Sequence, residues 1–208
     1  MTTISRQTFT EIVLGLDRSR RHIVAIAGAP GSGKSTFAEM VCERLNDEMP
    51  GASAILPMDG FHFDDRVLEA RGDRPRKGAP HTFDVGGLRS TLERLKRREE
   101  DVVAVPVFDR SIEIARAGAR LIEREVPIIL VEGNYLLLDE PRWAVLREFF
   151  DLTAFLDVPE ATLRERLTDR WLGFGLEGET LRAKLEGNDL PNVATVVRRS
   201  IDPDYRIG

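Results

Sequence analysis

Cysteine, long hydrophobic runs and an excess of positive charge are all scarce in this sequence of 208 residues. The single Cys42 cannot form an internal disulfide, which fits a reducing compartment, and we expect it to be a packed small residue. No apolar run approaches the roughly 20 residues of a membrane-spanning helix, and polar residues interrupt the N-terminal region. Basic residues number 30 against 35 acidic ones, so no general basic field favours nucleic acid. We therefore expect a cytoplasmic protein with no membrane insertion and no nucleic-acid partner.

The remaining composition is that of an ordinary globular chain, with 42% hydrophobic and 31% charged residues. Short apolar runs alternate with helical patterns, which indicates an α/β fold with a mainly parallel sheet. We expect a single domain over 1–208, with a small lid within about 164–178. Strands are predicted at 22–27, 52–58, 102–108, 127–132 and 152–158. Helices are predicted at 6–16, 36–45, 85–98, 141–150, 161–171, 181–185 and 193–199. Segment 71–82 has the composition of a mobile loop, and 112–122 fits a hairpin or a helix.

The most specific motif is Gly-Ala-Pro-Gly-Ser-Gly-Lys-Ser-Thr at 28–36, which matches the phosphate-binding loop pattern G-x-x-x-x-G-K-[ST]. Glycines at this spacing let backbone N–H groups curl around phosphate oxygens. We expect Lys34 to reach the β- and γ-phosphates and Ser35 to bind Mg²⁺ through its hydroxyl. The residues expected to hold the nucleotide are Gly28, Ala29, Pro30, Gly31, Ser32, Gly33, Lys34, Ser35 and Thr36. An apolar strand before the loop and a helical pattern after it predict the three-layer fold of P-loop NTPases.

Acidic residues follow two other predicted strands. Glu132 ends the apolar run 128–131 at the Walker B position, where an acid orients Mg²⁺, although a strand-end acid can also cap a helix. Asp59 ends the segment after strand 52–58, where a carboxylate can position an acceptor hydroxyl and take its proton, although an Asp-Gly pair also forms turns. Ligands bind beyond the carboxyl ends of parallel strands, so we expect both acids, Asp109 and the phosphate loop to surround one site.

A basic helix is predicted at 161–171. Arg166 and Arg170 are one turn apart and share a helical face. Arginines on a segment that closes over a nucleotide would neutralise charge on the transferred phosphoryl group. A solvated helix with Arg–Glu pairs has the same pattern, so this segment alone does not decide between the two.

In combination, these motifs resemble the phosphate-loop kinase family that contains uridine kinase, phosphoribulokinase and pantothenate kinase. The resemblance covers most of the chain and rests on 28–36, 58–62, 77–80 with 82–84, 106–109, 131–133 and the arginine helix. Asp-Gly-Phe-His followed by Lys-Gly-Ala-Pro-x-Thr-Phe-Asp most resembles a bacterial subgroup described as fructose transport system kinases. The resemblance also implies that the strand ending at Glu132 lies beside the strand ending at Ala27, with strand 52–58 outside it.

The resemblance assigns roles to particular residues. It implies that Asp59 is the catalytic base, that Glu132 is the acidic metal residue, and that Arg166 and Arg170 act from the lid beside the catalytic Lys34. Residues matching regions that line an acceptor pocket are His62, Phe83, Asp84 and Asp109. His81, in the 71–82 loop, fits contact with the acceptor and a solvated loop equally well. Phe61 and Phe108 stand where uridine kinases usually carry tyrosines, which weakens the case for a nucleoside acceptor.

The sequence therefore predicts a kinase that uses ATP and Mg²⁺ to phosphorylate a hydroxyl of a small metabolite. A sugar such as fructose comes first, and a nucleoside or a pantothenate-like alcohol comes next. The alternative from another class is a nucleotide-dependent switch protein. Asp84-Val-Gly-Gly matches a GTPase motif formally, but no apolar strand precedes it and no guanine signature occurs. A homodimer is left open.

Overall fold

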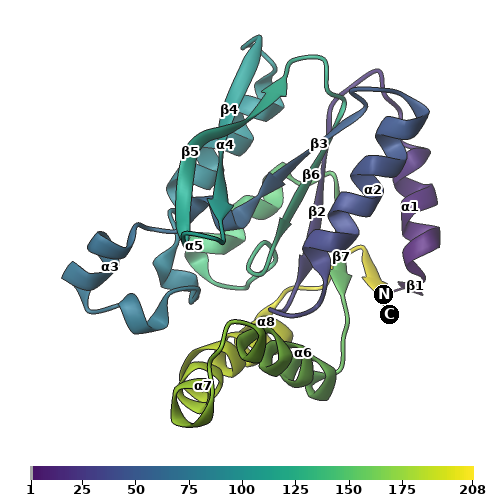
Figure 1. Ribbon diagram of the computed structural model, residues 1–208. Coiled ribbons are helices and arrows are strands. Elements are labelled where there is room, and N and C mark those ends of the chain that lie inside the picture. The colour runs from purple at the N-terminus through teal and green to yellow at the C-terminus, as the bar shows by residue number, and fades with distance from the viewer. Residues whose placement is uncertain (1) are drawn as a thin grey trace.

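The main sheet holds six parallel strands in the order β1-β8-β7-β2-β6-β3 in the computed structural model, which describes residues 2–208 (Figure 1). These strands are β1 (Thr2–Ile4), β2 (His22–Gly28), β3 (Ser53–Pro57), β6 (Ile128–Gly133), β7 (Leu152–Leu156) and β8 (Tyr205–Ile207). Strand β6 pairs with β2 on one side and with β3 on the other, which confirms the strand order predicted from the sequence. Both β2 and β6 are buried along their whole length, because helices cover both faces of the sheet.

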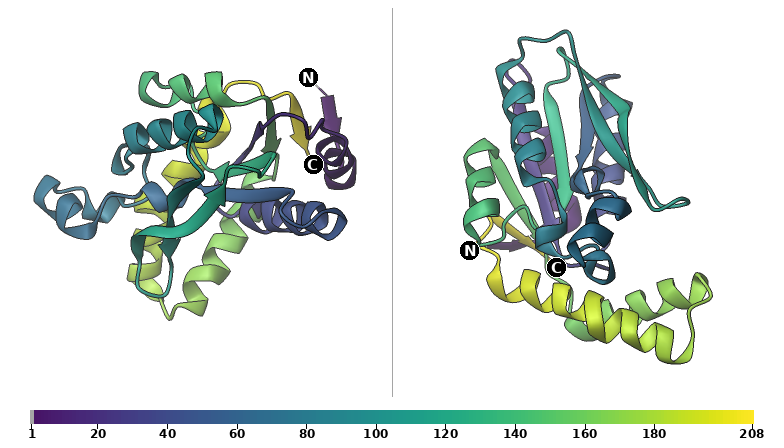
Figure 2. Two further views of the ribbon diagram at one scale, coloured as in Figure 1. Left: turned by 90° about the horizontal axis from the view of Figure 1, so that it is seen from above. Right: turned by 90° about the vertical axis from the view of Figure 1, so that its left-hand side faces the viewer.

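Helices form a layer on each face of this sheet, which makes the predicted three-layer α/β architecture (Figure 2). On one face, α1 (Arg6–Leu14) and α2 (Lys34–Glu48) bury a cluster that includes Phe9, Phe37 and Leu45. On the other face lie α4 (Val85–Arg97), α5 (Pro141–Ala144) and α8 (Leu190–Arg199). The core there includes Leu88, Val196 and Trp143, which is 2% exposed.

A two-stranded antiparallel hairpin stands apart from the main sheet. It consists of β4 (Val102–Asp109) and β5 (Ile114–Glu123), with a register irregularity at Pro106. Strand β5 decides the open question at 112–122 in favour of a hairpin. At the tip, Glu113 has a left-handed backbone with φ of 56°, which is uncommon for a residue other than glycine.

The carboxyl ends of the strands face a group of helices in the C-terminal part of the chain (Figure 1). This group comprises α6 (Glu160–Gly173), α7 (Gly178–Lys184), a π-helix (Leu185–Asp189) and the start of α8. The predicted lid at 164–178 therefore covers most of α6 and the turn into α7. No helix among residues 2–208 is long and apolar enough to cross a membrane.

The structure adds local detail that the sequence patterns did not predict. Segment 71–82 contains short 3-10 helices at Arg74–Arg76 and Pro80–Thr82, and its Lys77 is 8% exposed, whereas Arg74 and His81 are exposed. The helix predicted at 141–150 ends early, and a 3-10 helix (Val145–Phe149) follows it. Helix α3 (Asp65–Arg71) was not predicted. Neither were β1 and β8, because strands of three residues are too short to show a period.

Candidate active site

The phosphate loop has the backbone that anion binding requires. Gly31 and Gly33 have φ values of 83° and 84°, a left-handed conformation that side chains rarely permit. Gly33 is the N-cap residue of α2, so the free N–H groups of the first turn and the positive end of the helix dipole point to the loop. Lys34 follows directly and is 8% exposed. The loop is therefore a preformed cradle for phosphate with one cation beside it.

Ser35 and Glu132 meet across the gap between α2 and β6. The Ser35 hydroxyl donates a hydrogen bond of 3.0 Å to Glu132 Oε2, and Glu132 is 5% exposed. Mg²⁺ binds oxygen ligands and commonly takes only one or two from the protein, with waters and substrate phosphates completing the octahedron. A hydroxyl and a carboxylate beside a phosphate loop fit that donor set. Among residues 2–208, no group of three or more His, Cys, Asp or Glu side chains is arranged to hold a metal ion.

Asp59 lies in a 3-10 helix (Met58–Phe61) directly after β3, next to the end of β6. Burial works to raise the pKa of this carboxyl, but the charges of His62, Lys34 and Arg110 together hold it below its usual value. Burial also lowers the pKa of His62, and the charge of Asp59 opposes that shift. The lowered pKa of Asp59 favours its ionised form, which is the form able to accept a proton.

Glu132 behaves in the opposite way. Burial raises its pKa, the nearby charge of Asp59 adds to the rise, and Lys34 opposes it. Two carboxylates that share the same cations cannot both be ionised without cost. A divalent cation would relieve this repulsion, which agrees with the donor set described above.

The two lid arginines are placed differently. Arg166 donates from Nη1 to the carbonyl oxygens of Gly31 and Ser32, at 3.2 and 3.4 Å. Arg170 lines the cavity instead, and burial lowers its pKa. Within residues 2–208, Arg170 has no ion-pair partner. Helix α6 also packs against the loop through Leu167, whose Cγ would lie 3.3 Å from a Cβ at Gly31. Helix α6 therefore rests on the phosphate loop, and the guanidinium of its Arg170 lines the cavity.

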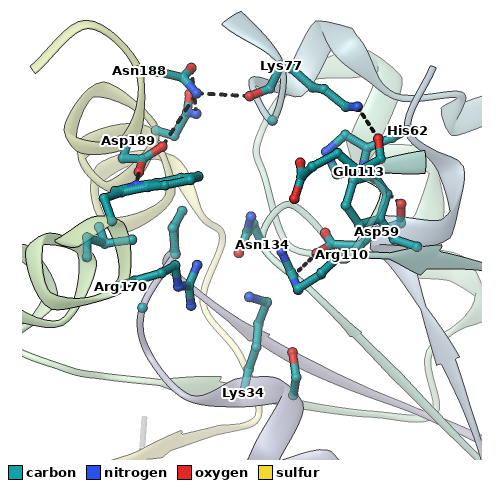
Figure 3. A pocket seen from close by; sticks show the side chains of 18 of the residues that line it. Lys34, Asp59, His62, Lys77, Arg110, Glu113, Asn134, Arg170, Asn188 and Asp189 are labelled. Atoms are coloured by element: carbon teal, nitrogen blue, oxygen red, sulfur yellow. Dashed lines mark hydrogen bonds and ion pairs between the residues drawn. The ribbon is translucent and has the colours of Figure 1, made fainter. Parts of the chain in front are cut away.

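These elements enclose a cavity of about 340 Å³ (Figure 3). Lys34 enters it from the phosphate loop, Arg170 from the lid, and Asp59 with Arg110 from the side of the hairpin. The walls also carry the aromatic side chains of Phe108, Trp171 and Phe174. The cavity is thus cationic near the phosphate loop and mixed polar and aromatic farther away.

Only one of the predicted acceptor residues lines this cavity. His62 does so, and its Nδ1 lies 2.7 Å from the carbonyl oxygen of Asp59. Phe83 is buried behind it, with ring centroids 4.0 Å apart. The other three lie outside the cavity: the Asp84 side chain caps α4 by accepting from Gly87 N, His81 lies 3.4 Å from Asp73, and Asp109 lies 3.3 Å from Arg116. Their placement gives acceptor binding no support, and those assignments stay predictions.

Several cavity residues were not singled out from the sequence. Trp171 donates from Nε1 to Asp189 Oδ2 at 2.5 Å, and its ring lies beneath the Lys184 ammonium at 4.7 Å. Lys77 belongs to the 77–80 motif but was given no role of its own, and its ammonium lies 2.5 Å from Asp65 Oδ1. Arg110 carries no sequence signal beyond its place after Asp109. The other cavity residues of this kind are Gly78, Glu113, Asn134, Asn188, Asp189 and Asn192.

Comparison with known proteins places these features in context. A family model described as phosphoribulokinase / uridine kinase matches residues 23–168. The uncharacterized protein YggC of Escherichia coli (strain K12) is 39% identical over 183 residues, which are 87% of this chain and 75% of that protein. The putative uridine kinase C227.14 of Schizosaccharomyces pombe is 32% identical over 198 residues, 91% and 83% of the two chains. A crystal structure of a putative fructose transport system kinase from Silicibacter sp. TM1040 is 40% identical with a TM-score of 0.90, and the match covers 99% of this chain and 100% of that one.

Proposed function

Since the chain belongs to the phosphoribulokinase / uridine kinase family, we propose that it is a kinase that uses ATP and Mg²⁺ to phosphorylate a hydroxyl of a small metabolite. One observation carries the proposal. The phosphate loop with Lys34, the Ser35–Glu132 pair and the Asp59 carboxylate come from three different strand ends and lie around connected cavity walls. A phosphate cradle, a metal-binding pair and a base are the parts that phosphoryl transfer to an alcohol requires.

On the nucleotide side, the N–H groups of the loop and the Lys34 ammonium bind the phosphates and neutralise charge that develops on them. Ser35 and Glu132 are the residues that would hold Mg²⁺. When bound, the metal ion would neutralise phosphate oxygens and help orient them. Arg170, with its free guanidinium in the cavity, supplies a further positive charge to the transferred group.

On the acceptor side, Asp59 orients the hydroxyl and takes its proton as the oxygen attacks the γ-phosphorus. Its carboxylate is 17% exposed, so it reaches the cavity while the surrounding cations keep it ionised. His62 packs between Phe83 and Phe108. Its Nδ1–H donates to the Asp59 carbonyl oxygen, so Nε2 of the neutral ring can accept a hydrogen bond from the acceptor hydroxyl.

A sugar is our first candidate for the acceptor. The Silicibacter protein, described as a fructose transport system kinase, shares 40% identity over nearly the whole chain. The cavity wall combines aromatic faces with amide and carboxylate groups, which suits a ring with several hydroxyls. A nucleoside or a pantothenate-like alcohol is the next candidate.

The test is a panel of sugars, nucleosides and pantothenate-like alcohols, assayed for ADP release that depends on the acceptor. Lys34→Ala is the control, because it removes the ammonium from the phosphate site without opening a core cavity. A switch protein would bind the nucleotide, yet no acceptor would speed ADP release or add to thermal stability in its presence. That result across a broad panel would contradict the kinase proposal.

A further inference from the structure

Arg110 forms an ion pair with the carboxylate of Asp59, the residue that we propose as the general base. Its Nη2 lies 2.6 Å from Asp59 Oδ2, a short charge-assisted contact. Arg110 lies in the turn directly after β4, whereas Asp59 follows β3, so the pair joins the hairpin to the main sheet. The arginine side chain is 58% exposed and the aspartate side chain 17%. The carboxylate is therefore largely enclosed, whereas its partner is an exposed cation from the hairpin.

The same pair stands between two cavities. The larger one, of about 340 Å³, holds the phosphate loop and the lid arginine. A smaller one of about 150 Å³ lies under the hairpin and is lined by Glu39, Glu132 and Arg120. Asp59, Arg110 and Phe108 line both. Movement of the Arg110 side chain alone would thus free Asp59 Oδ2 toward the two spaces that Asp59 lines.

This ion pair competes with the role of Asp59 as a general base, because both use the same carboxylate. A carboxylate oxygen that accepts from a guanidinium is less available to take a proton from an attacking oxygen. The contact can nevertheless open without unpacking the core, because the Arg110 side chain is 58% exposed and its guanidinium can turn into solvent. An acceptor that brings a hydroxyl to Asp59 can therefore displace Arg110. A single water makes fewer contacts with the cavity, so it has less binding free energy with which to displace the guanidinium.

We propose that Arg110 is a positioning residue that occupies Asp59 until an acceptor arrives and thereby suppresses hydrolysis of ATP. The proposal rests on the function proposed above. The suppressed reaction is attack by a water oxygen on the γ-phosphorus. The bond from the γ-phosphorus to the β–γ bridging oxygen breaks, ADP leaves with that electron pair, and one water proton passes to Asp59. The products are ADP and inorganic phosphate, and Asp59 later returns the proton to solvent.

The experiment measures ADP release from ATP and Mg²⁺ with no acceptor present. Arg110→Ala is expected to raise the rate about tenfold or more, since a general base contributes roughly 10²–10⁴-fold. Arg110→Lys keeps a cation near Asp59 and is expected to stay close to the parent. The matched control is Arg116→Ala, because Arg116 lies on the same hairpin, is 62% exposed and pairs with Asp109 away from both cavities. It should leave the rate unchanged.

The double variant Asp59→Asn with Arg110→Ala shows whether the gain passes through Asp59, and the rate should return to the parent level. A gain that survives in the double variant overturns the proposal, and so does a parental rate in an Arg110→Ala protein that is still stabilised by ATP and Mg²⁺. If ATP and Mg²⁺ fail to stabilise the parent protein itself, the proposed function fails and this inference fails with it.

A second readout needs neither nucleotide nor metal. In ¹⁵N NMR of the free protein, the Arg110 guanidinium should show restricted rotation and slow exchange with solvent. Both should be lost in Asp59→Asn and kept in Arg116→Ala. A freely rotating Arg110 guanidinium in the parent protein would contradict the inference, whatever the hydrolysis rates.

Discussion

The two walls of the cavity are built differently. The nucleotide wall belongs to the core: β2 and β6 are buried throughout, Lys34 is 8% exposed and Glu132 is 5% exposed. The proposed acceptor wall is carried by the β4–β5 hairpin and helix α6, and the side chain of Arg110 on the hairpin is 58% exposed. Exposed ion pairs contribute little stability, whereas packed strands are costly to distort. The phosphate site is therefore preformed, whereas the Arg110 part of the proposed acceptor wall can rearrange at small cost.

The largest loss of turnover should come from removing Lys34, the cation of the phosphate loop. Lys34→Ala is expected to lower turnover by about 10³-fold or more, because the β- and γ-phosphates lose a positioned charge. The fold should be unchanged, since the loop keeps its glycines and no large core volume is removed. Turnover and the circular dichroism spectrum are measured together. Parental turnover would show that the phosphate loop is not the active site.

Asp59 lies where the two walls of the cavity meet, and Asp59→Asn tests its role as the general base. The amide keeps the size and much of the hydrogen bonding but cannot take a proton, so transfer should fall roughly 10²–10⁴-fold. The loss should appear in kcat with both substrates saturating, and ATP affinity should barely change. Transfer at the parental rate would remove Asp59 from the mechanism.

The two arginines of α6 are expected to differ in effect, because Arg170 lines the cavity whereas Arg166 contacts the phosphate loop. Arg170→Ala is expected to lower kcat on the order of 10²-fold with a smaller change in ATP affinity, because the free guanidinium meets charge that develops in transfer. Arg166→Ala should cost about tenfold, since Arg166 contacts the carbonyls of Gly31 and Ser32. A pure loss of ATP affinity in both variants would point to ground-state binding.

Gly60→Ala probes the junction of sheet and hairpin. A Cβ there would lie 2.7 Å from the carbonyl carbon of Pro106 in β4, so backbone would have to shift. The free energy of unfolding is expected to fall by about 1–3 kcal/mol, measured by urea denaturation. Gly86→Ala in α4 is the matched control, because a Cβ there would make only an ordinary contact of 3.5 Å with Asp84 Oδ1. That variant should be neutral or more stable by up to about 1 kcal/mol.

The smallest expected change in stability is that of Glu132→Gln, which should be slightly more stable at pH 7 but less active. Burial raises the folded-state pKa of Glu132, so its contribution to stability is full below the unfolded pKa and is lost as pH rises through the folded pKa. At pH 7 the variant avoids that loss and should gain about 1 kcal/mol, while magnesium-dependent turnover falls. The gain should shrink as pH falls. If the free energy of unfolding of Glu132→Gln at pH 7 were lower than that of the parent, the predicted direction would be wrong.

The difference between the walls also explains how far the sequence could predict them. The phosphate loop, Glu132 and Asp59 sit in or directly after apolar strands, so local pattern and the rule for strand ends were enough to bring them together. Asp84 follows a loop and caps a helix, a role that competes with any motif containing Asp.

The acceptor wall depends on contacts between segments far apart in the sequence. Arg110 meets Asp59 across 51 positions, and Asn188 donates to the Lys77 carbonyl across 111. Neither pairing has a local period or a spacing rule. The π-helix that turns Asn188 and Asp189 toward the cavity is equally invisible to a pattern with a period of 3.6 residues.

The positions of the two tryptophans have a spectroscopic consequence. Trp143 is enclosed in the core beside Tyr135, whereas Trp171 forms part of the cavity wall with its N–H on Asp189 and its ring under Lys184. Indole emission depends on the polarity and charge around the ring. The chain therefore carries a native optical probe in its lid, and Trp143→Phe would leave that probe as the sole indole emitter, able to follow the filling of the cavity without a label.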